Sequence, residues 1–224
     1  CLNIRISMGE QFEKIKLMYG DSYRQHGDSP ASLLTPKGRS ELRFRAIDPF
    51  VQGPEITSVL DYGCGLGYLF EYLQNERRKV SYCGMDVMPE FVDACITKCP
   101  SGATFESIDP NASIRGHYDV VFSSGVFNLQ THADMSESKA YAFDRLKQLF
   151  ASASQVLVCD FLSPFVDFRQ PDGQHFTIEE ISEFCFLNLG RRFVIRHDLL
   201  PYEFTLIVWK DSEIKRPENI YLAD

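Results

Sequence analysis

Apolar residues in this chain of 224 residues fall into seven short runs that are typical of β-strands. Two of them, "YDVVFSS" and "QVLVCDF", are almost continuously apolar, as strands buried on both faces of a sheet are. The predicted strands are residues 56–61, 79–85, 103–107, 118–124, 155–161, 192–198 and 203–210. Segments with helical periodicity lie between several of these runs, namely residues 66–75, 89–98 and 136–151. This alternation predicts a parallel sheet with helices on both faces.

The end of the chain departs from that alternation. A helix is expected at residues 178–189, because Thr177 and Glu180 have the spacing of a capping box and Gly190 can end the helix in the left-handed conformation. The two strands in "RRFVIRHDLLPYEFTLIVWK" follow with only a short link between them. Such a link is too short for a crossover helix, so we expect an antiparallel pair.

The residues before the first strand also have helical character. Phe12, Ile15 and Met18 share one face, Gly20 is expected to end that helix, and Thr35-Pro36 is expected to open a second one. This segment is too short to fold as a separate domain, so we expect it to cover the carboxyl edge of the sheet. The predicted division is an N-terminal helical cap or lid (1–50), a main domain (51–213) and a C-terminal tail (214–224). We place no function in residues 1–7, which precede Met8 and are read as upstream or added sequence.

The fold class we predict is therefore α/β, a doubly wound, seven-stranded mixed sheet with a terminal antiparallel strand pair and a helical N-terminal cap.

Composition excludes several classes of partner. The formal net charge is −8, whereas a domain that follows phosphate backbones is usually basic. No apolar run approaches the ~20 residues of a membrane span. The seven cysteines include no Cys-x-x-Cys pair and no matching histidine set, which argues against a metal site. Most of them lie in apolar runs, so we expect a reduced, cytoplasmic protein.

A glycine-rich stretch carries the candidate chemistry. "DYGCGLG" places Gly63, Gly65 and Gly67 between a predicted strand and a predicted helix. Glycine lets a ligand approach the backbone there, and the helix offers free N–H groups. Asp86, 19 residues after the last glycine at the end of the second strand, is placed to accept both hydroxyls of a ribose.

Two details separate the possible nucleotide ligands. The dinucleotide fingerprint needs its third glycine at position 68, where this chain has Tyr68. Asp61, two residues before the first glycine, would repel a pyrophosphate but suits a ligand that carries an ammonium group. S-adenosylmethionine has an ammonium, a sulfonium and no phosphate, so the pattern favours it over a dinucleotide.

At this point the residues resemble a known family. "DYGCGLG" (61–67) looks like motif I of the class I S-adenosylmethionine-dependent methyltransferases, and "YCGMD" (82–86) looks like their second-strand acid. "FESID" (105–109) and "YDVVFSSG" (118–125) resemble the ends of their third and fourth strands. The terminal antiparallel pair is also similar to that family, and the resemblance covers roughly residues 40–210.

A closer likeness is to small stand-alone bacterial methyltransferases whose substrates are mostly unassigned. They have "HGDSP" and an Arg-Phe pair before motif I, here residues 26–30 and 43–44, and "SGVFN" (124–128) after the fourth strand. The Asn/Asp-Pro-Pro-Tyr/Phe stretch of many nucleic-acid and amide N-methyltransferases is missing, which lowers the expectation of base methylation.

The resemblance, taken with the spacing above, implies a set of cofactor contacts. Arg43 would face the cofactor carboxylate, since a guanidinium binds a carboxylate bidentately. Asp109 would meet the adenine amino group, although a turn role beside Pro110 is as good a reading. The predicted cofactor-binding residues are Arg43, Asp61, Gly63, Cys64, Gly65, Gly67, Asp86, Val87, Ile108, Asp109 and Ser124.

Three histidines in loops border the expected site. His26, His132 and His175 could each act as a general base, because imidazole titrates near neutrality. We name His26 and His132 as the catalytic candidates, while a surface-loop role stays open for each.

The function expected from the resemblance is methyl transfer from S-adenosylmethionine to an O or N atom of a small-molecule acceptor, such as a natural-product or glycan-pathway metabolite. We expect no nucleic-acid or membrane partner, and a monomer or homodimer. Two alternatives stay open: a nicotinamide-dependent reductase and a non-catalytic nucleoside-binding protein.

Overall fold

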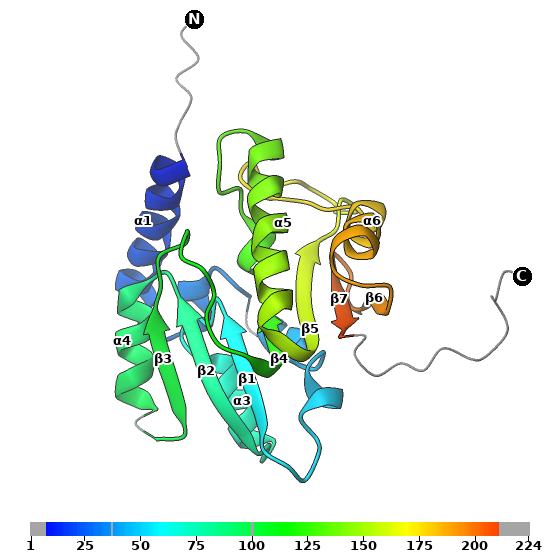
Figure 1. Cartoon of the computed structure of the whole chain (residues 1–224). Helices are drawn as coiled ribbons and strands as arrows, with labels where there is room; N and C mark the ends of the chain where they lie inside the picture. Colours follow the sequence, from blue (N-terminus) through cyan, green and yellow to red (C-terminus); the bar gives the residue numbers. More distant parts are fainter. Residues whose placement is uncertain (1–7, 37, 100, 211–224) are drawn as a thin grey trace, which may run out of the picture.

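The computed structural model describes residues 8–36, 38–99 and 101–210, which fold around one seven-stranded sheet (Figure 1). Its strands lie in the order β3-β2-β1-β4-β5-β7-β6. Each strand ends within two residues of its predicted limits, so the hydrophobic pattern located them all. The bounds are β1 Thr57–Tyr62, β2 Val80–Asp86, β3 Ala103–Ser107, β4 Tyr118–Ser123, β5 Ala153–Leu162, β6 Phe193–Leu200 and β7 Glu203–Trp209.

The pairing confirms the predicted mixed sheet. Strands β1 to β5 are parallel to one another, because each early crossover carries the chain back to the same edge. Only β7 runs the other way, and it pairs with β5 on one side and with β6 on the other. The terminal antiparallel pair is therefore present as expected.

Helices cover both faces of the sheet. One apolar core joins α5 and α6 to the sheet, with Leu146 and Ile181 fully buried in it. The other core joins α2, α3 and α4 to the opposite face through residues such as Leu69 and Val92. The bounds are α2 Arg39–Phe44, α3 Tyr68–Asn75, α4 Pro89–Lys98, α5 Met135–Ser152 and α6 Ile178–Asn188, with short 3-10 turns η1 Pro30–Leu33, η2 Asp48–Phe50 and η3 Val126–Asn128.

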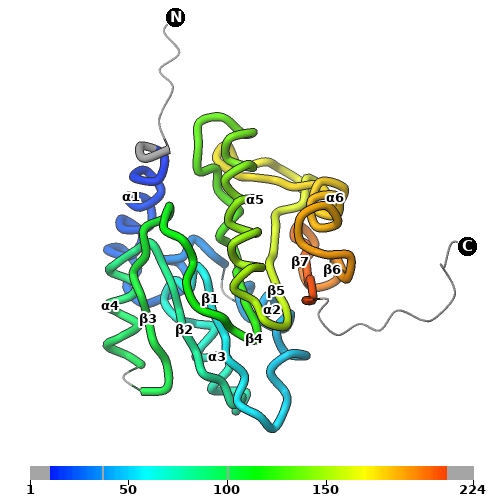
Figure 2. The backbone as a smooth tube through the Cα atoms, in the orientation of Figure 1, coloured from blue at the N-terminus to red at the C-terminus, as the bar shows by residue number. Residues whose placement is uncertain are grey.

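The first helix, α1 (Met8–His26), lies at the carboxyl end of the sheet, next to α4 (Figures 1 and 2). On one side the Tyr23 ring meets Phe91 of α4 edge-on, with centroids 5.4 Å apart. On the other side the Phe12 ring meets Tyr141 of α5, with centroids 5.5 Å apart. Since α4 and α5 cover opposite faces, α1 bridges the two helical layers.

Two expectations for the N-terminal helices were wrong. Gly20 does not end α1; it is buried beside Met88, and the helix continues to His26. The chain leaves the helix at Gly27, whose φ of +61° favours glycine. Thr35 does not cap α2, because its hydroxyl bonds the Leu33 carbonyl oxygen instead. Gly38, with φ of +81°, stands at that helix start.

The signals around α6 were mostly right. Thr177 and Glu180 form the reciprocal capping box, with the Glu180 N–H 3.1 Å from the Thr177 hydroxyl and the Thr177 N–H 2.8 Å from the Glu180 carboxylate. Gly190, however, does not have the left-handed backbone we expected. Its N–H donates to the Cys185 carbonyl oxygen at 2.9 Å, and that bond closes the last turn.

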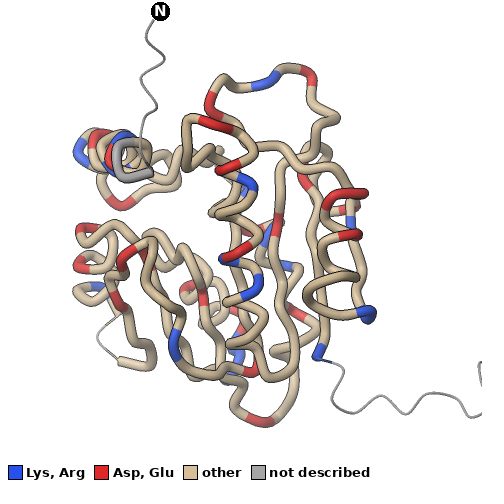
Figure 3. The backbone as a smooth tube through the Cα atoms, turned by 45° about the horizontal axis from the view of Figure 1, so that its top comes forward, with Lys and Arg blue, Asp and Glu red and all other residues tan. Residues whose placement is uncertain are grey.

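Charges of both signs are interspersed along the described backbone (Figure 3). No helix in the described ranges has the length and apolar character needed to cross a membrane. The outermost parts of the predicted division, residues 1–7 and 214–224, lie outside the described residues.

Candidate functional site

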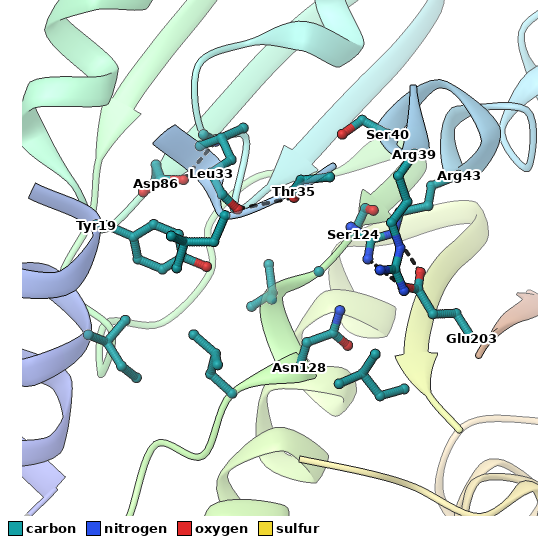
Figure 4. Close-up of a pocket in the computed structure, with 18 of the residues that line it drawn as sticks. Tyr19, Leu33, Thr35, Arg39, Ser40, Arg43, Asp86, Ser124, Asn128 and Glu203 are labelled. Atoms are coloured by element: carbon teal, nitrogen blue, oxygen red, sulfur yellow. Dashed lines mark hydrogen bonds and ion pairs between the residues drawn. The ribbon is translucent and has the colours of Figure 1, made fainter. Parts of the chain in front are cut away.

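A cavity of about 720 Å³ lies where the parallel strands end, beneath α1. Its size is within the range of roughly 300–1,000 Å³ that is usual for ligand pockets. Its wall comes from α1, the segment around η1, α2, the glycine loop, the residues after β4 and the connection that follows β5. Figure 4 shows Asp86 and Tyr19 on one side of this space and Arg39, Arg43 and Glu203 on the other.

The glycine loop needs its glycines for two different reasons. Gly63 and Gly65 line the cavity with φ of +80° and +53°. A Cβ on Gly63 would lie 2.1 Å from the Val126 side chain, and one on Gly65 would lie 2.9 Å from Leu33. Gly67 is not part of the cavity wall; a Cβ there would meet the Cys95 sulfur at 3.1 Å. Positive φ and close contacts with neighbouring side chains therefore favour glycine at all three positions, and Gly63 and Gly65 also form part of the cavity wall.

Asp86 ties this loop to the start of α4. Its carboxylate accepts the Gly65 N–H at 2.7 Å and the Met88 N–H at 2.9 Å, and the residue is buried at the cavity wall. Burial raises the pKa of Asp86, while the backbone N–H groups act in the opposite direction. The carboxylate is thus held rigidly at the point where the sequence predicted a ribose contact.

Asp61 is a buried acid without a cation among the described residues. Its side chain accepts one hydrogen bond, from the Tyr82 hydroxyl at 2.5 Å, and only 4% of the residue is exposed. Burial raises its pKa to about 7, the Tyr82 hydrogen bond lowers it, and the nearby Asp86 raises it further. A ligand with an ammonium group would offset the free-energy cost of burying the ionised carboxylate. The Asp61 side chain therefore fits the predicted cofactor.

The remaining predicted contacts divide into two groups. Cys64, Val87, Ile108 and Ser124 all line the cavity. Asp109 does not: it is exposed, and its carboxylate accepts the Asn111 N–H at 2.7 Å in a local turn. The turn reading of Asp109 is therefore the one the structure favours.

Arg43 faces the cavity but is already paired. Its Nε lies 2.6 Å and its Nη2 lies 2.7 Å from the two carboxylate oxygens of Glu203, the first residue of β7. Arg39 pairs with the same carboxylate. Burial opposes the charge on Arg43, but the carboxylates of Asp160 and Glu203 raise its pKa. Sequence reasoning missed Glu203, although an acid within the apolar run "YEFTLIVW" was a usable signal.

The histidines are arranged differently from our expectation. Neither His26, which ends α1, nor His132, which contacts the Thr131 hydroxyl at 2.9 Å, belongs to the cavity wall. His175 does. Its Nδ1 lies 2.7 Å from the Ser163 carbonyl oxygen, which can only accept, so Nδ1 carries the proton. Nε2 is left as an acceptor, and it is buried without a hydrogen-bond partner among the described residues.

Two further wall residues were not predicted as contacts. Leu33 packs directly over Gly65, and nothing in its sequence context marked it. The Tyr19 ring meets Phe91 with centroids 6.1 Å apart, and its hydroxyl points into the cavity (Figure 4). Burial and the nearby Asp86 raise the pKa of Tyr19 to about 12, so the hydroxyl stays protonated at neutral pH. The described residues contain no cluster of metal ligands.

Comparisons show that this chain is similar to known methyltransferases. A family model described as "Methyltransferase domain" matches residues 59–149. A protein of Mycobacterium tuberculosis (strain ATCC 25618 / H37Rv), named "Putative methyltransferase Rv1506c", is 29% identical over 169 residues, which cover 75% of this chain and 97% of the relative.

Solved structures share the fold. The magnesium protoporphyrin IX methyltransferase of Synechocystis PCC 6803, with bound S-adenosylhomocysteine, has a TM-score of 0.62 at 18% identity, over 88% of this chain and 97% of that one. The 1,6-didemethyltoxoflavin-N1-methyltransferase of Burkholderia thailandensis, with 1,6-didemethyltoxoflavin and S-adenosylhomocysteine bound, has a TM-score of 0.65 at 14% identity, over 94% and 93%.

Proposed function

We propose that this chain is a class I S-adenosylmethionine-dependent methyltransferase, and that it methylates an O or N atom of a small organic acceptor with an apolar body. The observation that carries the proposal is a single cavity with two chemically different parts. One part has the glycine loop and the buried acids. The other combines apolar side chains with polar ones, among them Asp167, Gln170 and His175.

The first part is proposed to hold the cofactor. Asp61 would accept the ammonium group, Asp86 the ribose hydroxyls, and Gly63 and Gly65 leave room for the ligand at the backbone. Arg43 would donate to the carboxylate of the methionine moiety. S-adenosylmethionine supplies a methyl group that its sulfonium already makes reactive.

The second part is proposed to hold the acceptor. Leu129, Leu162, Val166 and Phe168 line it, at the end of β5 and on the segments that follow β4 and β5. These side chains offer an apolar surface for the body of an acceptor, while Asp167 and Gln170 on the same wall can bind a few polar groups. This combination supports an acceptor that has an apolar body with few hydroxyl groups. The bound ligand named for the Burkholderia thailandensis structure is also a small molecule.

Positioning is the main task left to the protein. Aligning an acceptor lone pair with the reactive methyl group can supply about 7–11 kcal/mol of the barrier. An oxygen acceptor also needs a base. His175 is the histidine that lines the cavity, and its neutral tautomer leaves Nε2 to accept a proton, so we propose His175 for that role in place of His26 and His132.

We also propose a cytoplasmic location. The six cysteines in the described part of the chain are all free thiols, which supports a reducing compartment. Whether the chain is a monomer or a homodimer stays a prediction.

The test is a set of acceptors offered to the purified protein with S-adenosylmethionine, with S-adenosylhomocysteine release as the readout. We expect turnover with phenols, heteroaromatic amines or similar apolar acceptors, and none with free sugars, DNA or RNA. Methylation of sugars alone, or of nucleic acid, would contradict the acceptor assignment. For an oxygen acceptor, His175→Gln should lower kcat by about 10²–10⁴-fold. His132→Gln, the matched control outside the cavity, should leave kcat unchanged.

A further inference from the structure

The guanidinium of Arg43 is held by a carboxylate from the far end of the chain. Glu203 lies 160 residues away and takes both Nε and Nη2 of Arg43 in a bidentate pair. Both side chains are shielded from solvent, with 11% of Arg43 and 3% of Glu203 exposed. Such a pair fixes the plane of the guanidinium and not merely its charge.

A second acid completes this support. Asp160 pairs in register with Thr205, and residues 203 and 205 point to the same face of β7, so Asp160 and Glu203 flank Arg43 from adjacent strands. The Asp160 carboxylate lies 3.9 Å from the Arg43 Nε. It also accepts the Gly125 N–H at 2.8 Å and the Ser124 hydroxyl at 2.5 Å, which fixes the segment after β4.

One edge of the Arg43 guanidinium, at Nη1, is not used by Glu203. Nη1 makes no hydrogen bond or ion pair with any described residue, and it lies against Gly125, where a Cβ would come within 3.2 Å of it. Gly125 and Ser124 both line the cavity. The free edge of Arg43 therefore lies next to the space in which the cofactor is proposed to bind.

We propose that Glu203 is a positioning residue for the cofactor: it holds Arg43 so that Nη1 alone meets the carboxylate of the methionine moiety. This rests on the proposed cofactor site. Glu203 itself touches neither cofactor nor acceptor in this assignment. The terminal strand pair thereby becomes part of the cofactor site through a single ion pair.

The two charged partners of Glu203 have different roles in this scheme. Arg39 pairs with one oxygen of the same carboxylate and lies at the rim, with 27% of its side chain exposed. It neutralises Glu203 without fixing Arg43. Replacing Arg39 should therefore leave the Arg43 orientation intact, whereas replacing Glu203 should release it.

The test compares two ligands by calorimetry. S-adenosylhomocysteine has the carboxylate, and 5′-methylthioadenosine has the same nucleoside without the amino-acid part. In Glu203→Gln we expect the Kd for S-adenosylhomocysteine to rise at least about tenfold, the usual effect of losing a hydrogen bond to a charged group. The Kd for 5′-methylthioadenosine should stay within about twofold of wild type. Glu41→Gln, an acid-to-amide change at an exposed position on α2, is the matched control and should change neither.

A double-mutant comparison separates positioning from a general effect. Because Glu203 acts through Arg43, Glu203→Gln should add little to the loss already caused by Arg43→Lys. If Glu203→Gln weakens both ligands equally, its role is structural only and the proposal fails. If it tightens S-adenosylhomocysteine, Glu203 competes with the ligand carboxylate and the proposal also fails.

Folding of the variant does not decide the result. If Glu203→Gln does not fold, Glu203→Asp replaces it, because this variant keeps the negative charge on a shorter side chain. The Kd for S-adenosylhomocysteine should again rise while the Kd for 5′-methylthioadenosine stays the same. An unchanged Kd for S-adenosylhomocysteine overturns the proposal. Arg39→Gln should leave both Kd values within about twofold. A wild-type protein that binds neither ligand would instead contradict the proposed cofactor site itself.

Discussion

At the scale of single residues, Asp61 is a buried carboxyl group whose ionisation is unfavourable until a cationic ligand binds. The carboxyl group is buried, and its one described partner is the neutral Tyr82 hydroxyl. Its pKa of about 7, raised chiefly by burial, means that the ligand-free folded protein holds this proton more tightly than the unfolded chain does. The stabilisation from Asp61 is therefore fully present at pH values below about 4 and is lost as the pH rises through 7.

A cationic ligand reverses that preference, so cofactor affinity should depend on pH. The ammonium group favours the ionised Asp61, and below the ligand-free pKa of about 7 binding must also release a proton. The affinity for S-adenosylhomocysteine should therefore fall by up to about tenfold per pH unit as the pH decreases from 7 to 5. Calorimetry in buffers of different ionisation enthalpy measures both the affinity and the proton released.

Asp61→Asn is the control for that prediction. Without the titrating carboxyl group of Asp61, the affinity should be low at every pH and the pH slope should disappear. The same variant should be more stable than wild type at pH 8 without ligand, because it no longer buries a charge. A pH slope that persists in Asp61→Asn would assign the effect to another residue.

At the scale of elements, residues 8–50 combine two kinds of contact. Asp28, in the loop after α1, is attached to α3 through the Tyr68 hydroxyl at 2.8 Å and to α4 through Lys98 at 3.1 Å. Leu33 lies over Gly65, and α1 bridges α4 and α5 above the cavity. A ligand in the cavity would contact this segment directly, so it has to open for exchange.

We therefore predict that residues 8–50 act as a lid. Hydrogen exchange, measured with and without S-adenosylhomocysteine, should show more protection in the ligand complex both at residues 12–46 and in the glycine loop. The physical reason is that ligand contacts favour the closed state of a segment drawn from the less stable part of the molecule. Protection confined to the glycine loop would make residues 8–50 a static cap.

The elements also show which local signals could be trusted. The Thr177–Glu180 capping box was predicted correctly, because both bonds form within four residues. The end of α1 and the start of α2 were not, since α1 continues through Gly20 to His26 and Thr35 bonds the Leu33 carbonyl oxygen. A glycine has several uses that look alike in a sequence, and tertiary contacts decide among them.

At the scale of the whole molecule, the cavity lies between the two helical layers and the bridging α1. A ligand that fills it contacts parts of the chain that belong to both cores, so its binding energy adds to the stability of the complete fold. S-adenosylhomocysteine should increase the free energy of unfolding by roughly 2.7 kcal/mol at one hundred times its Kd, because it binds only the folded protein. The Tm should rise accordingly. Differential scanning calorimetry measures this, with NADH as the comparison that should give no shift; a larger shift with NADH would contradict the cofactor.

The same scale explains what the sequence could and could not predict. Strand limits, the sheet class and the positions of Asp61, Gly63 and Asp86 at the cavity wall follow from periodicity and from spacing over a few tens of residues. The Arg43–Glu203 pair, the location of His175 and not His132 at the cavity wall, and the contact of Leu33 with Gly65 depend on segments brought together only by folding. Hydrophobic pattern locates elements, but it has no information on which polar groups meet across them.

The position of β7 has a consequence for how the protein comes to exist. It is the last of the seven strands in chain order, yet it lies inside the sheet between β5 and β6, and it carries the partner of Arg43. At about 5–20 residues per second, translation takes roughly 8–32 s to travel the 160 residues from Arg43 to Glu203. During that interval the nascent chain has an arginine of the buried kind without its carboxylate, and once β5 has been made it also exposes the edge of β5 that will pair with β7. The nascent chain is therefore most prone to aggregate late in synthesis, when most of its apolar residues have already been made.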